Sequence, residues 1–158
     1  MKVTGVDEMA PLTIAVADTS VLLAAFNRKD SHHAVGVMAL NIPRFLLISP
    51  LVLAELDYLL TTQAGETEAV NAVTRLLALA GQGHVQFPVV DRRLLAEAEA
   101  LMRQYRGHAL GFADTVNAAL AWHLQRPVIL SLDQHYVNVF APRRPGERRF
   151  EVYPAARG

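Results

Sequence analysis

Short apolar runs alternate along this chain with longer segments in which apolar residues recur at helical spacing. The runs have the length of buried strands and cover residues 13–17, 45–48, 85–90, 128–131 and 150–153. The segments between them predict helices over residues 20–26, 32–40, 49–60, 66–80, 91–103 and 112–124. This alternation predicts an α/β fold with a central parallel sheet.

Composition places the chain among globular proteins with one domain. It has 158 residues, of which 52% are apolar and 19% charged, and no repeat or low-complexity linker divides it. Residues 1–12 are interpreted as an N-terminal extension and residues 13–158 as a single domain. The extension lacks the basic start and apolar block of a signal peptide, and no apolar stretch is long enough to span a membrane. We therefore expect a cytoplasmic protein without membrane contact.

Cysteine and charge exclude several other classes. The chain has no cysteine, which excludes disulfides and thiolate metal sites. Its formal net charge is zero, so only local groups of cations could hold a polyanion. Nearly all of the cations are arginines, and many fall within residues 92–106 and 143–149. The second stretch reads as a loop, for which a solvated turn is the alternative interpretation. The six histidines show no ligand spacing, and we interpret them, His135 included, as surface or packing residues.

Two apolar runs end in an aspartate. Asp18 follows the first predicted strand, and Asp133 follows the run that starts at Pro127. Because ligands of open α/β sheets collect outside the carboxyl ends of the strands, these carboxylates could share one site. Each also has a local explanation, as a helix cap for Asp18 and as a turn residue for Asp133.

Two further carboxylates belong to predicted helices. Glu55 lies in a strongly apolar segment, so we expect it to be partly buried or close to the packed side of its helix. A buried charge must be paired or bind a metal. Helical spacing does not decide between Glu55 and Asp57, and a solvated stripe that carries both is the alternative. Asp114 falls in the first turn of its helix, where the helix dipole favours an acid without any function.

Taken together, the four carboxylates predict a site for a hard divalent ion. Carboxylate oxygens and water are the ligands that Mg²⁺ and Mn²⁺ select. Several carboxylates in one pocket repel one another and need a cation to stay ionised. An ion held in this way can activate water and orient a phosphodiester.

The order and spacing of four segments resemble a PIN domain, most closely the VapC toxins of bacterial toxin–antitoxin pairs. The resemblance runs from about Ile14 to Phe140. It rests on Ala17-Asp18-Thr19-Ser20, Ser49-Pro50-Leu51-Val52-Leu53-Ala54-Glu55-Leu56, Gly111-Phe112-Ala113-Asp114-Thr115 and Ser131-Leu132-Asp133-Gln134-His135-Tyr136.

The resemblance implies a three-layer α/β/α sandwich and a Mg²⁺- or Mn²⁺-dependent endoribonuclease. It also implies a homodimer that a cognate VapB-like antitoxin neutralises, with RNA as the substrate. The acidic quartet of the family falls on Asp18, Glu55, Asp114 and Asp133, and the supporting hydroxyl falls on Ser20. The first three acids would hold one ion, and Asp133 would complete the site or help to hold a second ion.

Other interpretations stay open at this point. A catalytically silent PIN-like module could bind RNA or protein without cleaving it. A phosphoacceptor signalling domain also gathers aspartates at strand ends, but it uses a lysine late in the chain, and no lysine follows Lys29. The apolar helices between residues 31 and 80 could serve a dimer interface, an antitoxin groove or simply the core.

Overall fold

A parallel sheet forms the centre of the fold in a computed structural model whose described residues are 12–154. Within these residues the strands are β1 (Ile14–Ala17), β2 (Phe45–Leu47), β3 (Val85–Gln86), β4 (Val128–Leu130) and β5 (Glu151–Tyr153). The helices are α1 (Thr19–Phe26), α2 (His33–Leu40), α3 (Pro50–Ala64), α4 (Glu66–Gly81), α5 (Arg92–Gln104), α6 (Phe112–Trp122) and α7 (His135–Asn138). The strand order is β3-β2-β1-β4-β5, and every pair is parallel. The predicted α/β fold is confirmed.

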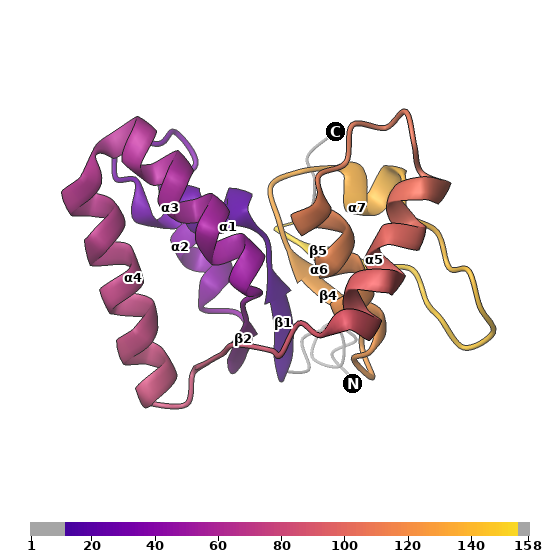
Figure 1. Cartoon of the computed structure of the whole chain (residues 1–158). Helices are drawn as coiled ribbons and strands as arrows, with labels where there is room; N and C mark the ends of the chain where they lie inside the picture. Colours follow the sequence, from indigo (N-terminus) through magenta and orange to yellow (C-terminus); the bar gives the residue numbers. More distant parts are fainter. Residues whose placement is uncertain (1–11, 155–158) are drawn as a thin grey trace, which may run out of the picture.

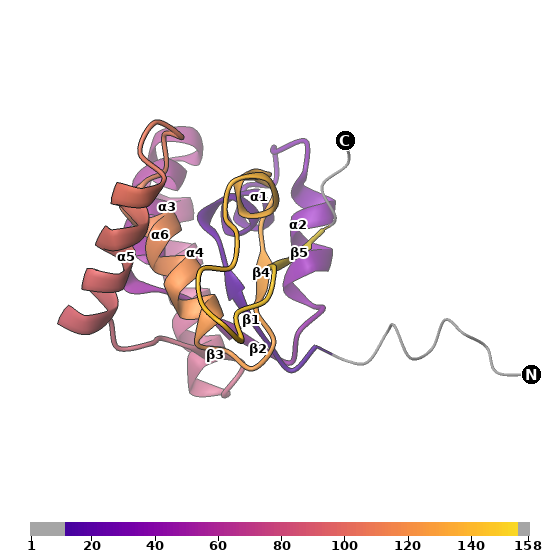
Figure 2. The same ribbon diagram turned by 90° about the vertical axis from the view of Figure 1, so that its right-hand side faces the viewer.

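Helices cover both faces of the sheet. Ala15 and Ala17 of β1 pack into a core shared with α1 to α4, whereas Val16 between them packs into a core shared with α5, α6 and α7. Figure 1 shows the two groups of helices, and Figure 2 shows α2 and α5 on opposite sides of the strands. Right-handed crossovers require this division, because the connections from β1 to β3 and from β3 to β5 run in opposite directions across the sheet.

The two central strands, β1 and β4, mark the point where the strand order reverses. β1 connects along the chain toward β2 on one side, while its other neighbour β4 arrives from the far edge. The backbone N–H of Asp18 donates to the carbonyl of Leu130 at 2.9 Å, which ties the carboxyl ends of the two strands together. Parallel sheets bind ligands at such a switch point.

The edge strand β3 is shorter than the sequence predicts. It covers Val85–Gln86 instead of residues 85–90, so the predicted length is wrong. Its partner β2 has only three residues to pair with, and Pro88 has no N–H to donate to a ladder. The chain leaves the sheet there and reaches α5 through an extended segment.

Local sequence signals set most helix boundaries. Ser49 accepts a hydrogen bond from the N–H of Leu51 and Pro50 opens α3, and the side chain of Asp91 caps α5. The short helix α7 was not predicted. Gly36 lets α2 cross α1 closely, because a Cβ there would lie 2.9 Å from the backbone nitrogen of Ala25.

The predicted N-terminal extension lies outside the described residues, apart from Leu12. The side chain of Leu12 is buried in the core, and its carbonyl accepts a hydrogen bond from the N–H of Arg44. In the part of the chain that is described, no helix is long and apolar enough to cross a membrane.

Candidate active site

Asp18 lies where β1 passes into α1, and its side chain is buried, with the residue only 2% exposed. It occupies the N-cap position of α1, but its carboxylate accepts no capping hydrogen bond from a backbone N–H of that helix. The cap interpretation of this residue is therefore wrong. The carboxylate turns instead toward β4, α6 and α7.

Four neutral donors surround the carboxylate of Asp18. Oδ2 accepts from Ser20 Oγ at 2.8 Å and from Ser131 Oγ at 2.9 Å. Oδ1 accepts from Tyr136 Oη at 3.1 Å and from Asn117 Nδ2 at 3.3 Å. No lysine or arginine among residues 12–154 pairs with it. A buried carboxylate with neutral donors alone keeps an uncompensated negative charge, which attracts a cation.

The two serines join the β1–α1 junction to the segment after β4. Ser20 Oγ accepts a hydrogen bond from the N–H of Leu132 at 2.9 Å, and Ser131 Oγ accepts one from the N–H of Asp133 at 3.0 Å. Each hydroxyl hydrogen is then free to point at Asp18, so the oxygens of both serines act as donors toward the acid and acceptors toward the backbone. Ser20, the predicted supporting hydroxyl, is in contact with Asp18.

Asp114 approaches the same pocket from the first turn of α6. Its Oδ2 accepts the N–H of Gly111 at 2.9 Å, and its Oδ1 lies 3.4 Å from Tyr136 Oη and 3.5 Å from His135 Nε2. Burial alone would raise the pKa of Asp114. The attraction of His135, with the hydrogen bonds from Gly111 and Tyr136, outweighs burial and lowers that pKa, so the carboxylate stays charged.

Asp133 lies at the outer edge of the pocket and is exposed. Partial burial and then the negative charges of Asp18 and Asp114 raise its pKa, against the opposing attraction of His135. The repulsion shows that Asp18, Asp114 and Asp133 act on one another, as the sequence predicts for acids gathered at one site.

Glu55 does not behave as expected from its apolar surroundings. The buried stripe of α3 is Val52, Leu56 and Leu60, and Glu55 and Asp57 are both exposed. The expectation that Glu55 is partly buried is therefore wrong. None of the hydrogen bonds or ion pairs among residues 12–154 joins Glu55 to the other three acids.

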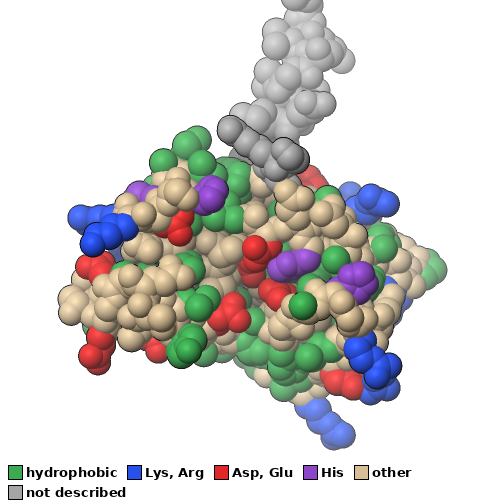
Figure 3. Space-filling model, turned by 90° about the horizontal axis from the view of Figure 1, so that it is seen from above, with side chains coloured by type: hydrophobic (Ala, Val, Ile, Leu, Met, Phe, Trp, Pro, Cys, Tyr) green, Lys and Arg blue, Asp and Glu red, His purple; other side chains and the backbone are tan. Residues whose placement is uncertain are grey.

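The side chains of Asp18, Asp114 and Asp133 offer oxygen donors of the kind that a divalent ion takes. Among residues 12–154, no group of three or more His, Asp or Glu side chains is arranged to hold a metal ion. Their chemistry favours an ion nevertheless, because a buried carboxylate and two neighbouring acids concentrate negative charge in one pocket. Figure 3, viewed from above, shows acidic side chains and histidine together near the middle of this face, with lysines and arginines toward its margins.

Three polar residues of the pocket were not assigned to it from the sequence. Asn117 lies one helical turn after Asp114 in an alanine-rich helix, and that spacing alone could have placed it on the same face. Ser131 ends the apolar run before Asp133. His135 was interpreted as incidental, but its ring lies against Asp114; burial would lower its pKa, and the attraction of Asp114 outweighs burial and raises it.

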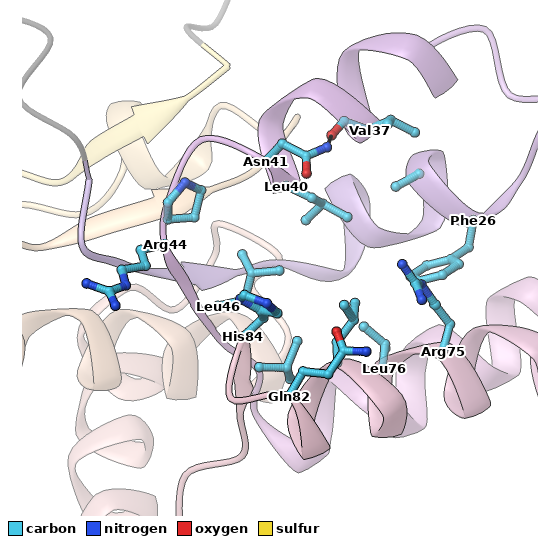
Figure 4. A pocket seen from close by; sticks show the side chains of 14 residues that line it. Phe26, Val37, Leu40, Asn41, Arg44, Leu46, Arg75, Leu76, Gln82 and His84 are labelled. Carbon is cyan, nitrogen blue, oxygen red and sulfur yellow. Dashed lines mark hydrogen bonds between the residues drawn. The ribbon is translucent and has the colours of Figure 1, made fainter.

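A second hollow lies on the α1–α4 side of the fold, away from the acids. It has a volume of about 530 Å³ between α1, α2, α4 and the β2–β3 edge. Figure 4 shows Val37 of α2 and Asn41, which follows α2, facing Leu76 of α4, with Arg75 and Arg44 toward opposite ends. The lining of the hollow combines apolar side chains with polar ones, and two arginines stand at its rim.

Comparisons with known proteins agree with this fold. Residues 15–140 match the PIN domain family. Ribonuclease VapC26 of Mycobacterium tuberculosis (strain ATCC 25618 / H37Rv) is 33% identical over 140 residues, which cover 88% of this chain and 99% of that protein. The match over residues 15–140 shows that this parallel sheet with its flanking helices is a PIN domain. The chain belongs to the PIN-domain family and, within it, to the VapC ribonuclease toxins of toxin–antitoxin systems.

Two solved structures have the same fold. VapC20 of Mycobacterium tuberculosis, described as a sarcin–ricin loop cleaving toxin, has a TM-score of 0.71 at 22% identity and covers 84% of this chain and 100% of its own. A chain of VapBC2 from Rickettsia felis, solved bound to a DNA fragment from their promoter, has a TM-score of 0.56 at 16% identity and covers 89% of this chain and 98% of its own. The predicted α/β/α sandwich is confirmed.

Proposed function

We propose that this protein is a Mg²⁺- or Mn²⁺-dependent endoribonuclease whose ion is held by Asp18, Asp114 and Asp133, with Glu55 as a further ligand. The observation that carries the proposal is the buried carboxylate of Asp18, which four neutral donors hold in place and no lysine or arginine within residues 12–154 neutralises. A bound divalent ion supplies the positive charge that phosphodiester hydrolysis requires.

The residues of the chain divide the remaining work. Ser20 and Ser131 fix the plane of the Asp18 carboxylate, and Asp133 stands at the exposed rim, where it can meet an ion that arrives with the substrate. Glu55, which is exposed on α3, would hold the ion through a water molecule. His135 beside Asp114 offsets part of the negative charge that would repel RNA.

Exposed arginines supply the contacts to the RNA backbone. Arg103 pairs with Glu99, Arg143 stacks over Trp122 at 4.9 Å, and Arg148 donates to the carbonyl of Gln125 at 2.6 Å. These three hold local structure. Of the arginines within residues 92–106 and 143–149, those that make no such side-chain contact with the described residues are Arg92, Arg93, Arg106, Arg144 and Arg149. Neutralising a phosphate-contacting arginine lowers the slope of log affinity against log salt concentration by about one.

The second hollow is the site where a VapB-like antitoxin binds. Its apolar walls suit an amphipathic segment, and Arg44 and Arg75 at its rim favour acidic side chains on that segment. Reversing one rim charge, as in Arg75→Glu, is expected to weaken antitoxin binding without changing RNA cleavage.

A homodimer, the state implied by the family, is tested by the mass of the purified protein in light scattering.

The central experiment measures Mg²⁺-dependent cleavage of a mixed RNA pool that includes a sarcin–ricin loop oligonucleotide. That oligonucleotide is chosen because VapC20 is described as cleaving this loop. We expect cleavage with Mg²⁺, none with EDTA and none from Asp114→Ala. Asp57→Ala is the matched control, because it removes an exposed acid. Binding of RNA without cleavage by the wild type would support the silent binding module instead.

A further inference from the structure

We propose that Tyr136 and Asn117 form a positioning pair that sets the spacing of Asp18 and Asp114 for the divalent ion. This inference rests on the proposed metal site and deepens it. Both residues are buried, Tyr136 at 1% exposure and Asn117 at 0%. Neither is an acid, and neither carries charge to the ion.

The Tyr136 hydroxyl lies between the two carboxylates. Its oxygen is 3.1 Å from Asp18 Oδ1 and 3.4 Å from Asp114 Oδ1. Two like-charged groups brought this near to one donor repel each other, and a shared hydroxyl hydrogen reduces that repulsion. The hydroxyl is therefore the element that fixes how far apart the two acids lie before an ion arrives.

Asn117 decides where the hydroxyl hydrogen points. Its Nδ2 donates to Tyr136 Oη at 3.2 Å and to Asp18 Oδ1 at 3.3 Å. Because the tyrosine oxygen accepts from Asn117, its own single hydrogen is left for a carboxylate. A tyrosine hydroxyl keeps its hydrogen at neutral pH, so this hydrogen is available to the carboxylates.

The amide of Asn117 has one stable orientation. Its Oδ1 is buried and has no hydrogen-bond partner, which costs stability. The flipped amide would place Oδ1 against the charged oxygen of Asp18, which is worse. The side-chain carbonyl of Asn117 therefore stays unpaired, while its amide nitrogen donates to both Asp18 and Tyr136.

Aromatic packing holds the tyrosine ring rigidly. Tyr136 stacks on Phe140 with ring centroids 5.7 Å apart and meets the edge of Phe150 at 6.3 Å. A hydroxyl on such a ring cannot follow the carboxylates if they move. The ring of Tyr136 belongs to the hydrophobic core, whereas its hydroxyl and Asn117 add the contact to the acids.

The test is calorimetric titration of the full chain with Mn²⁺ alone, without RNA. Removal of a group that orients metal ligands typically weakens metal binding by about 10- to 100-fold, and we expect about tenfold weaker binding in Tyr136→Phe. Tyr105→Phe is the matched control: Tyr105 touches the same Phe140 ring at 5.2 Å, but its hydroxyl bonds the backbone of Ala141. Its Mn²⁺ affinity is expected to equal that of the wild type.

Asn117→Ala completes a double-mutant cycle and also serves if Tyr136→Phe fails to fold, since alanine suits the interior of α6. We expect it to weaken Mn²⁺ binding by about threefold, and the double variant to be no weaker than Tyr136→Phe. Unchanged or tighter binding in these variants would overturn the positioning role while leaving the metal site intact. Failure of the wild type to bind Mn²⁺ would overturn the metal site and the positioning role together.

Discussion

The starts of α1 and α5 carry the same residue in the same local position and use it differently. Asp18 and Asp91 are both N-cap residues with extended backbone, at φ −82° and ψ 158° and at φ −91° and ψ 178°. Asp91 is exposed, and its carboxylate accepts the N–H of Leu94 at 3.0 Å. Asp18 is buried and leaves its helix uncapped. The difference teaches that an acid at a helix start becomes a candidate ligand when its carboxylate turns away from the helix.

The largest expected effect separates these two acids directly. Asp18→Asn keeps the size of the side chain but removes the charge, so we expect cleavage to fall by more than about 100-fold, as for loss of a metal ligand. The metal-free variant is expected to melt at the same or a higher temperature, because an uncompensated buried charge is gone. Asp91→Asn, the matched control, is expected to retain full cleavage. Normal activity in Asp18→Asn would contradict its assigned role.

A second pair tests the exposed acids of α3. Glu55→Gln is expected to reduce cleavage by about tenfold or more and to weaken Mn²⁺ binding, if the exposed carboxylate supports the ion through solvent. Asp57→Asn, two residues away and equally exposed, is expected to change neither measurement. Equal effects in both variants would assign the loss to general surface charge and remove Glu55 from the site.

The cap at α5 gives a smaller effect that appears only in stability. Asp91→Ala removes the hydrogen bond to Leu94 and is expected to lower the free energy of unfolding by about 1 kcal/mol. Chemical denaturation measures this change. Cleavage is expected to stay constant. A loss of activity without a loss of stability would contradict the interpretation of Asp91 as a helix cap only.

Glu151 extends the contrast to a carboxylate whose partner is a cation, and it gives the smallest effect. Arg126 binds it through two hydrogen bonds of 2.6 Å, and this bonding, against a smaller effect of burial, lowers the pKa of Glu151. The pair is more than a third exposed, so Glu151→Gln is expected to cost less than about 1 kcal/mol at neutral pH.

The pH dependence of that cost follows from the direction of the shift. A lowered pKa means that Glu151 stabilises the fold above its unfolded pKa, and that this stabilisation disappears as the pH falls through the folded value. The stability difference between Glu151→Gln and the wild type is therefore expected to close below the ordinary pKa of 4.5. A difference that grows in acid would show that the ion pair is not its source.

The sequence predicts the fold well because the signals for it are local. Apolar runs and helical periodicity place the strands and helices, and Ser49 and Asp91 mark helix starts through the caps they form. The predicted length of β3 is wrong because that length depends on how many residues the partner strand β2 offers for pairing.

The sequence predicts only part of the site, because the residues that contact Asp18 lie far from it along the chain. Asp18 is recognisable at a strand end, but the donors that turn its carboxylate inward include Ser131, 113 positions away, and Tyr136, 118 positions away. The exposure of Glu55 depends on which stripe of α3 meets the core, and an apolar helix offers several. No local pattern specifies either outcome.

A crystal soaked in Mn²⁺ and measured by anomalous scattering tests the central claim most directly. The account predicts an anomalous peak within bonding distance of the carboxylates of Asp18 and Asp114, with Ser20 still bonded to Asp18. A pocket without a peak, with Asp18 retaining all four of its neutral donors at high Mn²⁺ concentration, would contradict it.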